Sequence, residues 1–240
     1  MRWSVATVAE TVPQSAEVVS LYLDVVDWPG HLAGQHVDVR LTAQDGYSAQ
    51  RSYSIASPPG AERLELTVAR LDDGEVSPYL TTDLDVGDQL EVRGPIGGYF
   101  VWDAADTRPV LLVGGGLGVV PLMAMLRLHA ALNHDGAMRL VYSTRTRRQI
   151  LYRDEFDRLD SERRAVTVTL TRDDDPDWSG RLGRVNRQLL CEAGWSPDVE
   201  PRCFVCGPTP FVEAVANALV ALGHKPDNIK AERFGPTAGD

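Results

Sequence analysis

Cysteine is scarce in this chain of 240 residues, which contains only Cys191, Cys203 and Cys206. Three thiols cannot form a disulfide framework, and an all-cysteine iron–sulfur cluster requires four. Cys203 and Cys206 form a CxxC pattern, but it lies in the apolar run CFVCG, which favours a buried strand over a redox pair. The five histidines show no spacing typical of metal ligands, so we predict no metal site.

The sequence also lacks a long uninterrupted hydrophobic run. The longest, VLLVGGGLGVVPLMAM at 110–125, has 16 residues with four glycines and a proline, which makes it too short and too broken to span a bilayer. The N-terminal MRWSVATVAET has no secretory hydrophobic core, because Glu10 interrupts it. We therefore expect a cytoplasmic protein without membrane insertion.

Basic residues are few in the first part of the chain. Residues 1–104 contain six Arg, no Lys and 16 Asp or Glu and carry the whole formal charge of −10, whereas residues 105–240 hold 18 basic and 18 acidic residues. An acidic chain disfavours non-specific binding of nucleic acid, so no such partner is expected. The shift in charge, in a chain long enough for two domains, predicts a boundary between residues 104 and 105.

The first unit, residues 1–104, has the pattern of an antiparallel β-barrel. Alternating or β-branched runs separated by turn-rich stretches predict strands at 4–12, 17–25, 35–42, 50–56, 63–70 and 89–93. One short helix is expected near 77–83.

The second unit, residues 105–240, alternates strand and helix patterns, which predicts a parallel α/β sheet of the Rossmann type. Strands are expected at 109–113, 139–143, 165–170 and 203–207, and helices at 120–132, 150–160 and 210–223. The acidic run at 173–177, which Pro176 interrupts, is interpreted as a solvated loop.

A glycine cluster, GGGLG at 114–118, follows the first of these strands and opens a helix. Glycines let a diphosphate approach the backbone, and the helix N-terminus then presents free N–H groups to it. Gly116 and Gly118 fit the first two positions of the dinucleotide fingerprint, and Pro121 stands at the third. The alternative is a tight strand–helix turn that binds nothing.

The next strand ends in Ser143, Thr144 and Arg145, and residues 139–153 contain five arginines and no acid. Enzymes that use NAD commonly place a carboxylate here for the ribose hydroxyl, whereas a 2′-phosphate suits cationic, bidentate donors. The pattern favours NADPH over NADH. The alternative is that these arginines pair with the acids at 154, 155 and 157.

Six motifs then follow one another along the chain: RSYSIAS (51–57), GEVSPYL (74–80), GPIGGYF (94–100), GGGLGVVP (114–121), CGPTPF (206–211) and ERF (232–234). In this order and spacing they resemble the ferredoxin–NADP reductase superfamily, from about residue 3 to residue 234. The resemblance implies an FAD-binding barrel followed by an NAD(P)-binding domain, as in the reductase part of oxygenase and ferredoxin reductases without their fused iron–sulfur domain.

For the flavin, the resemblance implies a binding segment of Arg51, Ser52, Tyr53 and Ser54. Arg51 matches the contact to the flavin diphosphate, Tyr53 the aromatic beside the isoalloxazine ring, and Ser54 the hydroxyl near N5. Ser77 matches a second phosphate contact at the start of the short helix. FAD is expected, with FMN less favoured. Without the resemblance, RSYSIAS is an amphipathic strand.

For the nucleotide, the resemblance implies a diphosphate loop and further contacts along the sheet edge. The residues carried over are Gly115, Gly116, Gly118 and Pro121 in the loop, Ser143, Arg145 and Tyr152 at the 2′-phosphate and adenine, Thr171 and Arg172 after the third strand, and Cys206 and Gly207 beside the nicotinamide. Two positions depart from the family pattern, where Leu117 replaces a Thr or Ser and Phe211 replaces a common Met.

Four residues are expected at the reacting centre: Ser54, Cys206, Glu232 and Phe234. Phe234 resembles the terminal aromatic that covers the flavin and gives way to the nicotinamide, and Glu232 the acid that assists proton traffic. Phe234 could instead be an ordinary packing residue of the last strand.

Three functions are compatible with these features. The first is an NAD(P)H-dependent reductase of a separate carrier, such as a ferredoxin or an oxygenase component. A separate carrier is expected because the chain ends six residues after the ERF motif and lacks the cysteines of a fused cluster. The second is a reductase of small acceptors, such as free flavin, quinones or metal complexes. The third is a flavin-bearing electron-transfer or regulatory subunit with little turnover of its own.

Overall fold

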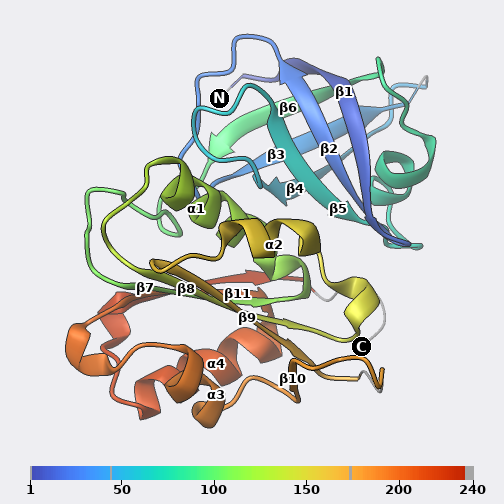
Figure 1. Ribbon diagram of the computed structural model, residues 1–240. Coiled ribbons are helices and arrows are strands. Elements are labelled where there is room, and N and C mark those ends of the chain that lie inside the picture. Colours follow the sequence, from blue (N-terminus) through green and yellow to red (C-terminus); the bar gives the residue numbers. More distant parts are fainter. Residues whose placement is uncertain (1, 44, 173–174, 236–240) are drawn as a thin grey trace.

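The computed structural model describes residues 2–43, 45–172 and 175–235, and within them two six-stranded sheets (Figure 1). The first is antiparallel, in the order β4-β3-β6-β1-β2-β5. A bridge between Ile55 and Leu66 joins its two edges into the predicted barrel. Its strands are β1 (Ser4–Ser15), β2 (Val18–Val25), β3 (His36–Thr42), β4 (Ser48–Ser54), β5 (Leu64–Ala69) and β6 (Gln89–Ile96).

The alternation of apolar and polar residues that predicted these strands corresponds to side chains that point alternately into the barrel core and away from it. On β3, Val37 and Val39 are fully buried in the barrel core. The alternate residues Asp38 and Arg40 lie on the opposite face, where Asp38 accepts a hydrogen bond from Arg93 at 2.6 Å. The bounds of β1 to β6 confirm all six predicted strands. The predicted short helix is a single π-helical turn, Tyr79–Asp83.

The second sheet is parallel, in the order β10-β9-β8-β7-β11-β12. It confirms the predicted α/β class. In Figure 1, α1 and α2 lie between the barrel and this sheet, and α3 and α4 cover its other face. The elements are β7 (Val110–Gly115), α1 (Val119–Ala131), β8 (Met138–Thr144), α2 (Arg153–Leu159), β9 (Arg164–Leu170), β10 (Arg181–Leu182), α3 (Arg187–Ala193), β11 (Arg202–Pro208), α4 (Thr209–Ala221) and β12 (Ile229–Phe234). Short 3₁₀ turns cover Gly116–Gly118, Arg147–Gln149, Pro197–Val199 and Pro226–Asn228.

The CxxC pattern is part of a strand, as predicted. Cys203 and Cys206 are both free and buried on β11. Cys203 belongs to the cluster packed by α3 and α4, whereas Cys206 belongs to the cluster packed by α1. The two thiols therefore face opposite sides of the sheet, and burial raises the pKa of Cys203 to about 12.

The barrel and the parallel sheet share one apolar cluster. Phe100 and Trp102, in the connection between β6 and β7, pack with residues of α1. Gly34 allows this close approach, because a Cβ there would lie 2.7 Å from Cε of Met125 and 1.9 Å from the Phe100 carbonyl oxygen. The predicted boundary at 104/105 falls in the same connection and stays a prediction.

The described residues contain no helix long and apolar enough to cross a membrane. Asp173 and Asp174, from the acidic run interpreted as a loop, lie outside the described residues.

Candidate functional site

A cavity of about 700 Å³ lies between the barrel and the carboxyl ends of the parallel strands. Its walls come from the β1–β2 turn, the end of β5, and the residues that follow β7, β8, β9 and β11. The strand order reverses direction between β7 and β11, and ligands of open α/β sheets bind at such a point. The cavity therefore lies where this fold holds a nucleotide.

The glycine loop forms the floor of the cavity, and each glycine has a local reason. Gly116 has φ +55° and open space around it, so its backbone is accessible to a ligand. A Cβ on Gly118 would lie 2.0 Å from the Cys206 carbonyl oxygen, and one on Gly115 would lie 2.8 Å from the Phe211 ring. The loop is thus a bare backbone turn at the N-terminus of α1, whose helix dipole favours an anion there.

Pro121 is buried in the first turn of α1 and does not line the cavity. A proline fits this turn because its missing N–H would have no partner within the helix. The structure therefore gives Pro121 a part in shaping the loop rather than direct contact with the nucleotide.

One side of the cavity, beside the glycine loop, is polar. We refer to it as the polar wall, and it contains four predicted residues: Ser143, Arg145, Thr171 and Arg172. The backbone N–H of Thr171 donates to Thr144 at 3.0 Å, and that of Arg172 donates to Arg145 at 2.9 Å. The pairing of β8 and β9 thus continues past the strand ends. It brings the residues after β8 and the residues after β9 to the same carboxyl-terminal edge of the sheet.

The predicted alternative, in which the arginines of this segment pair with the acids of α2, fails at two positions. Arg147 forms an ion pair with Asp175 at 3.0 Å, and Glu155 pairs with Arg127. The carboxylate of Glu155 is therefore directed away from the cavity and towards the domain interface.

Arg184 also lines the cavity, although no sequence motif pointed to it. It follows the two-residue strand β10, which is too short to leave a periodic pattern. The barrel contributes Glu17 and Arg70 to the opposite wall. These residues come together only through the packing of the two sheets.

Tyr152 does not lie in the cavity, which corrects the expected contact with the 2′-phosphate or adenine. Its ring is 3% exposed, and its hydroxyl donates to Oγ1 of Thr67 on β5 at 2.6 Å. The physical reason is the left-handed backbone at Tyr152, φ 56°, which turns the chain into α2 and directs the ring at the barrel.

The predicted flavin segment forms β4, on the side of the barrel nearest α1 and α2 in Figure 1. Arg51 is 54% exposed and donates to Glu75 at 3.1 Å. Tyr53 packs half-buried on the barrel core, where burial raises its pKa to about 12. Ser54 is buried at the strand end. An exposed guanidinium beside an aromatic face suits a flavin diphosphate and ring.

Two other predicted flavin residues have internal partners. Ser52 donates to Asp38 at 2.6 Å on the face away from Tyr53. The hydroxyl of Ser77 accepts a hydrogen bond from the backbone N–H of Leu71 at 3.0 Å. Their side chains therefore shape the barrel, and the structure does not bring Ser52 to the same face as Arg51.

Cys206 and Glu232 are neighbours in the register of β11 and β12. Burial raises the pKa of the Glu232 carboxyl to about 7, and its Oε2 is buried with no hydrogen-bond partner among the described residues. Burial and the nearby Glu232 also raise the pKa of the Cys206 thiol. Glu232 can thus hold or release a proton near neutral pH.

Phe234 completes this edge. It lines the cavity, pairs with Pro208 in the strand register, and packs against the apolar cluster that contains Cys206. Gly207 lies under the Phe211 ring, where a Cβ would lie 2.9 Å from that ring. The orphaned oxygen of Glu232, the bare glycine loop and the exposed Arg51 together fit a flavin on β4 and a dinucleotide on the loop.

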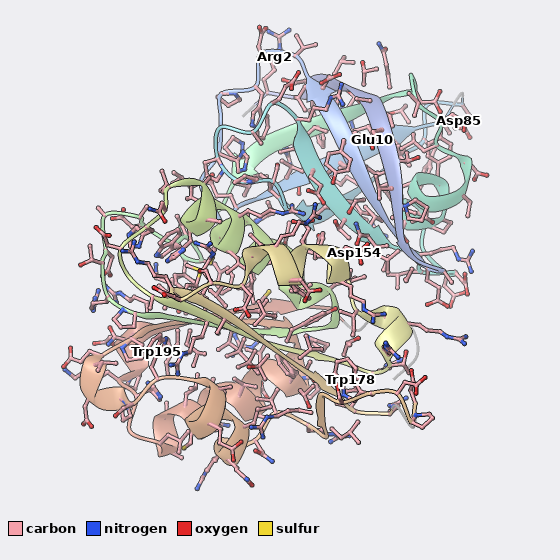
Figure 2. All side chains as sticks on the ribbon, viewed as in Figure 1. Arg2, Glu10, Asp85, Asp154, Trp178 and Trp195 are labelled. Carbon is pink, nitrogen blue, oxygen red and sulfur yellow. The ribbon has the colours of Figure 1, made fainter. Side chains whose placement is uncertain are left out.

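Figure 2 shows side chains filling the space between the barrel and the parallel sheet, with Asp154 labelled at the start of α2 in this region. Trp178 and Trp195 are labelled lower on the sheet, away from the barrel. No group of acidic, His or Cys side chains suited to a metal ion occurs in the part of the chain that the structure describes.

Comparison with protein families gives two matches. Residues 6–101 match the oxidoreductase FAD-binding domain. Residues 112–217 match the oxidoreductase NAD-binding domain. The two matches cover the barrel and most of the parallel α/β unit.

Among curated proteins, the chain is 35% identical over 212 residues to the glycine betaine monooxygenase reductase subunit of Chromohalobacter salexigens. The match covers 86% of this chain but 57% of that relative, so the chain spans less than two thirds of its length.

Solved structures agree in fold. The flavohem-like FAD/NAD binding domain of a nitric oxide dioxygenase from Vibrio cholerae superposes with a TM-score of 0.86 at 26% identity, over 97% of this chain and 99% of that one. An Amycolatopsis cytochrome P450 reductase superposes with a TM-score of 0.84, also at 26% identity, over 99% of this chain and 71% of that one.

Proposed function

Because the chain belongs to the oxidoreductases that join an FAD-binding and a NAD-binding domain in the ferredoxin–NADP reductase arrangement, we propose that it passes electrons from NADPH through bound FAD to a separate one-electron carrier. The observation that carries this proposal is that the glycine loop and Phe234 line one cavity. Cys206 and Glu232 are paired on β11 and β12, two residues before the Pro208–Phe234 pair that reaches this cavity. A cytoplasmic location, expected from the sequence, is part of the proposal.

Each domain has its own task in this proposal. Arg51, Tyr53 and Ser54 hold the flavin against β4, and Gly115, Gly116 and Gly118 leave room for the nucleotide diphosphate. A bound flavin would supply the chemistry of accepting hydride from a reduced nicotinamide and releasing the two electrons one at a time. Phe234, at the edge of the cavity, would shield the bound groups from water.

Glu232 is the residue that exchanges the proton accompanying this transfer, and Cys206 is its neutral neighbour. With a pKa of about 7, Glu232 exchanges a proton at working pH without becoming a fixed charge. The neutral Cys206 thiol beside it keeps the strand ends apolar, because burial raises its pKa. Hydride transfer then depends on distance and orientation, which the two packed domains provide.

The preference for NADPH rests on the polar wall. Ser143, Arg145 and Arg172 line the cavity where the strand ends meet, and Arg184 adds a fourth polar side chain. Charged donors of this kind stabilise a phosphate by roughly 1.5–3 kcal/mol per hydrogen bond.

The proposal that the acceptor is a protein draws support from the Chromohalobacter relative, which is named as a reductase subunit of a monooxygenase. The test is steady-state oxidation of NADPH and NADH with cytochrome c, a one-electron protein acceptor, and separately with free flavin, a quinone or ferricyanide. The proposal expects turnover with cytochrome c and a higher kcat/KM for NADPH. Turnover with the small acceptors alone would favour the small-acceptor reductase, and no turnover at all would favour a regulatory subunit.

A further inference from the structure

A buried polar cluster joins the two domains on the α1–α2 side of the parallel sheet. Arg127 on α1, with Tyr152 and Glu155 at α2, meets Glu65 and Thr67 on β5 of the barrel. We refer to these five residues as the interdomain clamp. None of them was singled out by the dinucleotide or flavin motifs as a link between the domains.

Arg127 is the centre of the clamp. Its guanidinium donates to both carboxylate oxygens of Glu155, at 2.9 and 2.5 Å, in the bidentate fork that only arginine offers. Its Nη1 also donates to Glu65 at 2.5 Å. The Arg127 side chain is 12% exposed and that of Glu65 is 3% exposed, so this is a buried charge pair across the domain interface.

Tyr152 provides the second link. Its hydroxyl donates to Thr67, its backbone N–H donates to Oε1 of Gln14 on β1 at 3.0 Å, and its ring lies 5.0 Å from the Arg127 guanidinium. A non-glycine residue in the left-handed region is strained, and such strain persists only where the surroundings over-determine it. Here the surroundings are the barrel.

The clamp connects the two segments that must meet for hydride transfer. Nη1 of Arg127 donates to the carbonyl of Ala56 at 2.9 Å, two residues beyond Ser54. The N–H of Ala56 in turn donates to the carbonyl of Glu65 at 2.8 Å. At its other end, α1 begins directly after the glycine loop. One side chain therefore ties the end of the flavin strand to the helix that carries the nucleotide loop.

The chemistry of the cluster favours a geometric role over a purely stabilising one. A buried ion pair costs desolvation, and apolar residues of similar size commonly serve stability as well or better. A guanidinium that is hydrogen-bonded to two carboxylates and one backbone carbonyl instead fixes the orientation of α1 and its distance from the barrel. Burial raises the pKa of the Glu65 carboxyl in spite of the nearby Arg127, so the pair carries a desolvation cost.

We propose that Arg127 is a positioning residue for hydride transfer, which holds the glycine loop of α1 at a fixed distance from the flavin strand through Ala56, Glu65 and Glu155. This inference rests on the proposed function. Arg127 lies outside the lining of the nucleotide cavity, and its guanidinium is bonded to Glu65, Glu155 and the Ala56 carbonyl. Its effect is on the rate of flavin reduction rather than on nucleotide affinity.

The experiment is anaerobic stopped-flow reduction of the flavin-loaded protein over a range of nucleotide concentrations, which separates the limiting rate from the dissociation constant. The variants are Arg127→Lys, which keeps the charge but loses the fork, Arg127→Met, and Tyr152→Phe, which removes only the hydroxyl that reaches Thr67. Leu219→Ala, in the apolar cluster on the far face of the sheet, is the stability control.

We expect Arg127→Lys and Arg127→Met to lower the limiting rate about 10- to 100-fold, the range that a misplacement near 1 Å produces. Tyr152→Phe should lower it less, with nucleotide dissociation constants and flavin content unchanged in all three. Leu219→Ala should lower the Tm without lowering the rate.

Each other outcome has a distinct meaning. If the Arg127 variants lower only the Tm, in step with Leu219→Ala, the clamp is structural and the inference is overturned. If Arg127→Met does not fold, Arg127→Lys and Tyr152→Phe decide in the same way. If the unaltered protein is not reduced by either nucleotide, the proposed function fails, and the positioning role fails with it.

Discussion

The buried carboxyl of Glu232 predicts an unusual dependence of stability on pH. Burial raises its pKa from 4.5 to about 7 in the folded protein. At about 1.4 kcal/mol per pKa unit the shift corresponds to roughly 3 kcal/mol, and partial solvent access reduces the expected effect to about 2 kcal/mol. Because the unfolded chain releases this proton first, the folded protein loses that stability as pH rises from about 4.5 through 7, and no more above it.

Glu232→Gln removes this titration. The Tm of the variant, relative to the unaltered protein, should rise with pH between 5 and 7 and then level off towards pH 8. About 2 kcal/mol corresponds to a change of roughly 4–8 °C for a chain of this size. The control is Glu213→Gln, an exposed position on α4.

The assay is thermal unfolding followed by circular dichroism at pH 5, 6, 7 and 8 for the three proteins. The control should remain parallel to the unaltered protein at every pH. Parallel curves for Glu232→Gln as well would refute the reasoning, because they would mean that Glu232 titrates in the folded state as it does in the unfolded chain.

Three further predictions concern the cofactor sites. Arg51→Ala should lower the flavin content of the purified protein, read from absorbance near 450 nm, while the second domain stays folded by circular dichroism; full yellow colour would remove the diphosphate role. Arg145→Ala should raise the KM for NADPH by about 10- to 100-fold, from the loss of one or two charge-assisted bonds, and change that for NADH little; equal effects would count against the 2′-phosphate. Gly118→Ala, whose Cβ would lie 2.0 Å from the Cys206 carbonyl oxygen, should destabilise the fold by about 3 kcal/mol, whereas Gly98→Ala, with open space around it, should cost less than about 0.5 kcal/mol; a folded Gly118→Ala with normal Tm would contradict the tight loop.

The two domains were predictable because their core faces repeat with different periods. Alternation along β3 and the strand–loop–helix pattern around the glycine cluster are local signals, and both were confirmed. The strands β10 and β12 and the helix α3 were not among the predicted elements. β10 has two residues, and α3 has seven, which is about two helical turns. β12 has six residues, IKAERF, with little apolar alternation. Only the cap of α3 left a signal, because the Asn186 side chain accepts a hydrogen bond from the N–H of Leu189.

The site was less predictable than the fold, because its members come from distant segments. The motifs led to the glycine loop, the strand ends and Phe234, all of which reach the cavity. The family resemblance assigned Tyr152 to the 2′-phosphate and adenine, but the left-handed backbone at Tyr152 turns its ring to the barrel.

The interdomain clamp left only an indirect trace in the sequence. Arg127 interrupts the apolar helix LMAMLRLHAAL, and Glu65 interrupts the apolar strand LELTVA. Each residue alone indicates a buried charge in need of a partner. That the two charges meet follows from the packing of α1 on β5, which no local pattern records.

The central claim is that this chain carries a flavin that its own nucleotide site reduces. The most direct test is an anaerobic titration of the purified protein with NADPH and, separately, with NADH, following the flavin absorbance near 450 nm. We predict rapid and complete bleaching with NADPH and slower bleaching with NADH. A protein that stays yellow with both nucleotides, or that cannot be reconstituted with FAD or FMN, would contradict the claim.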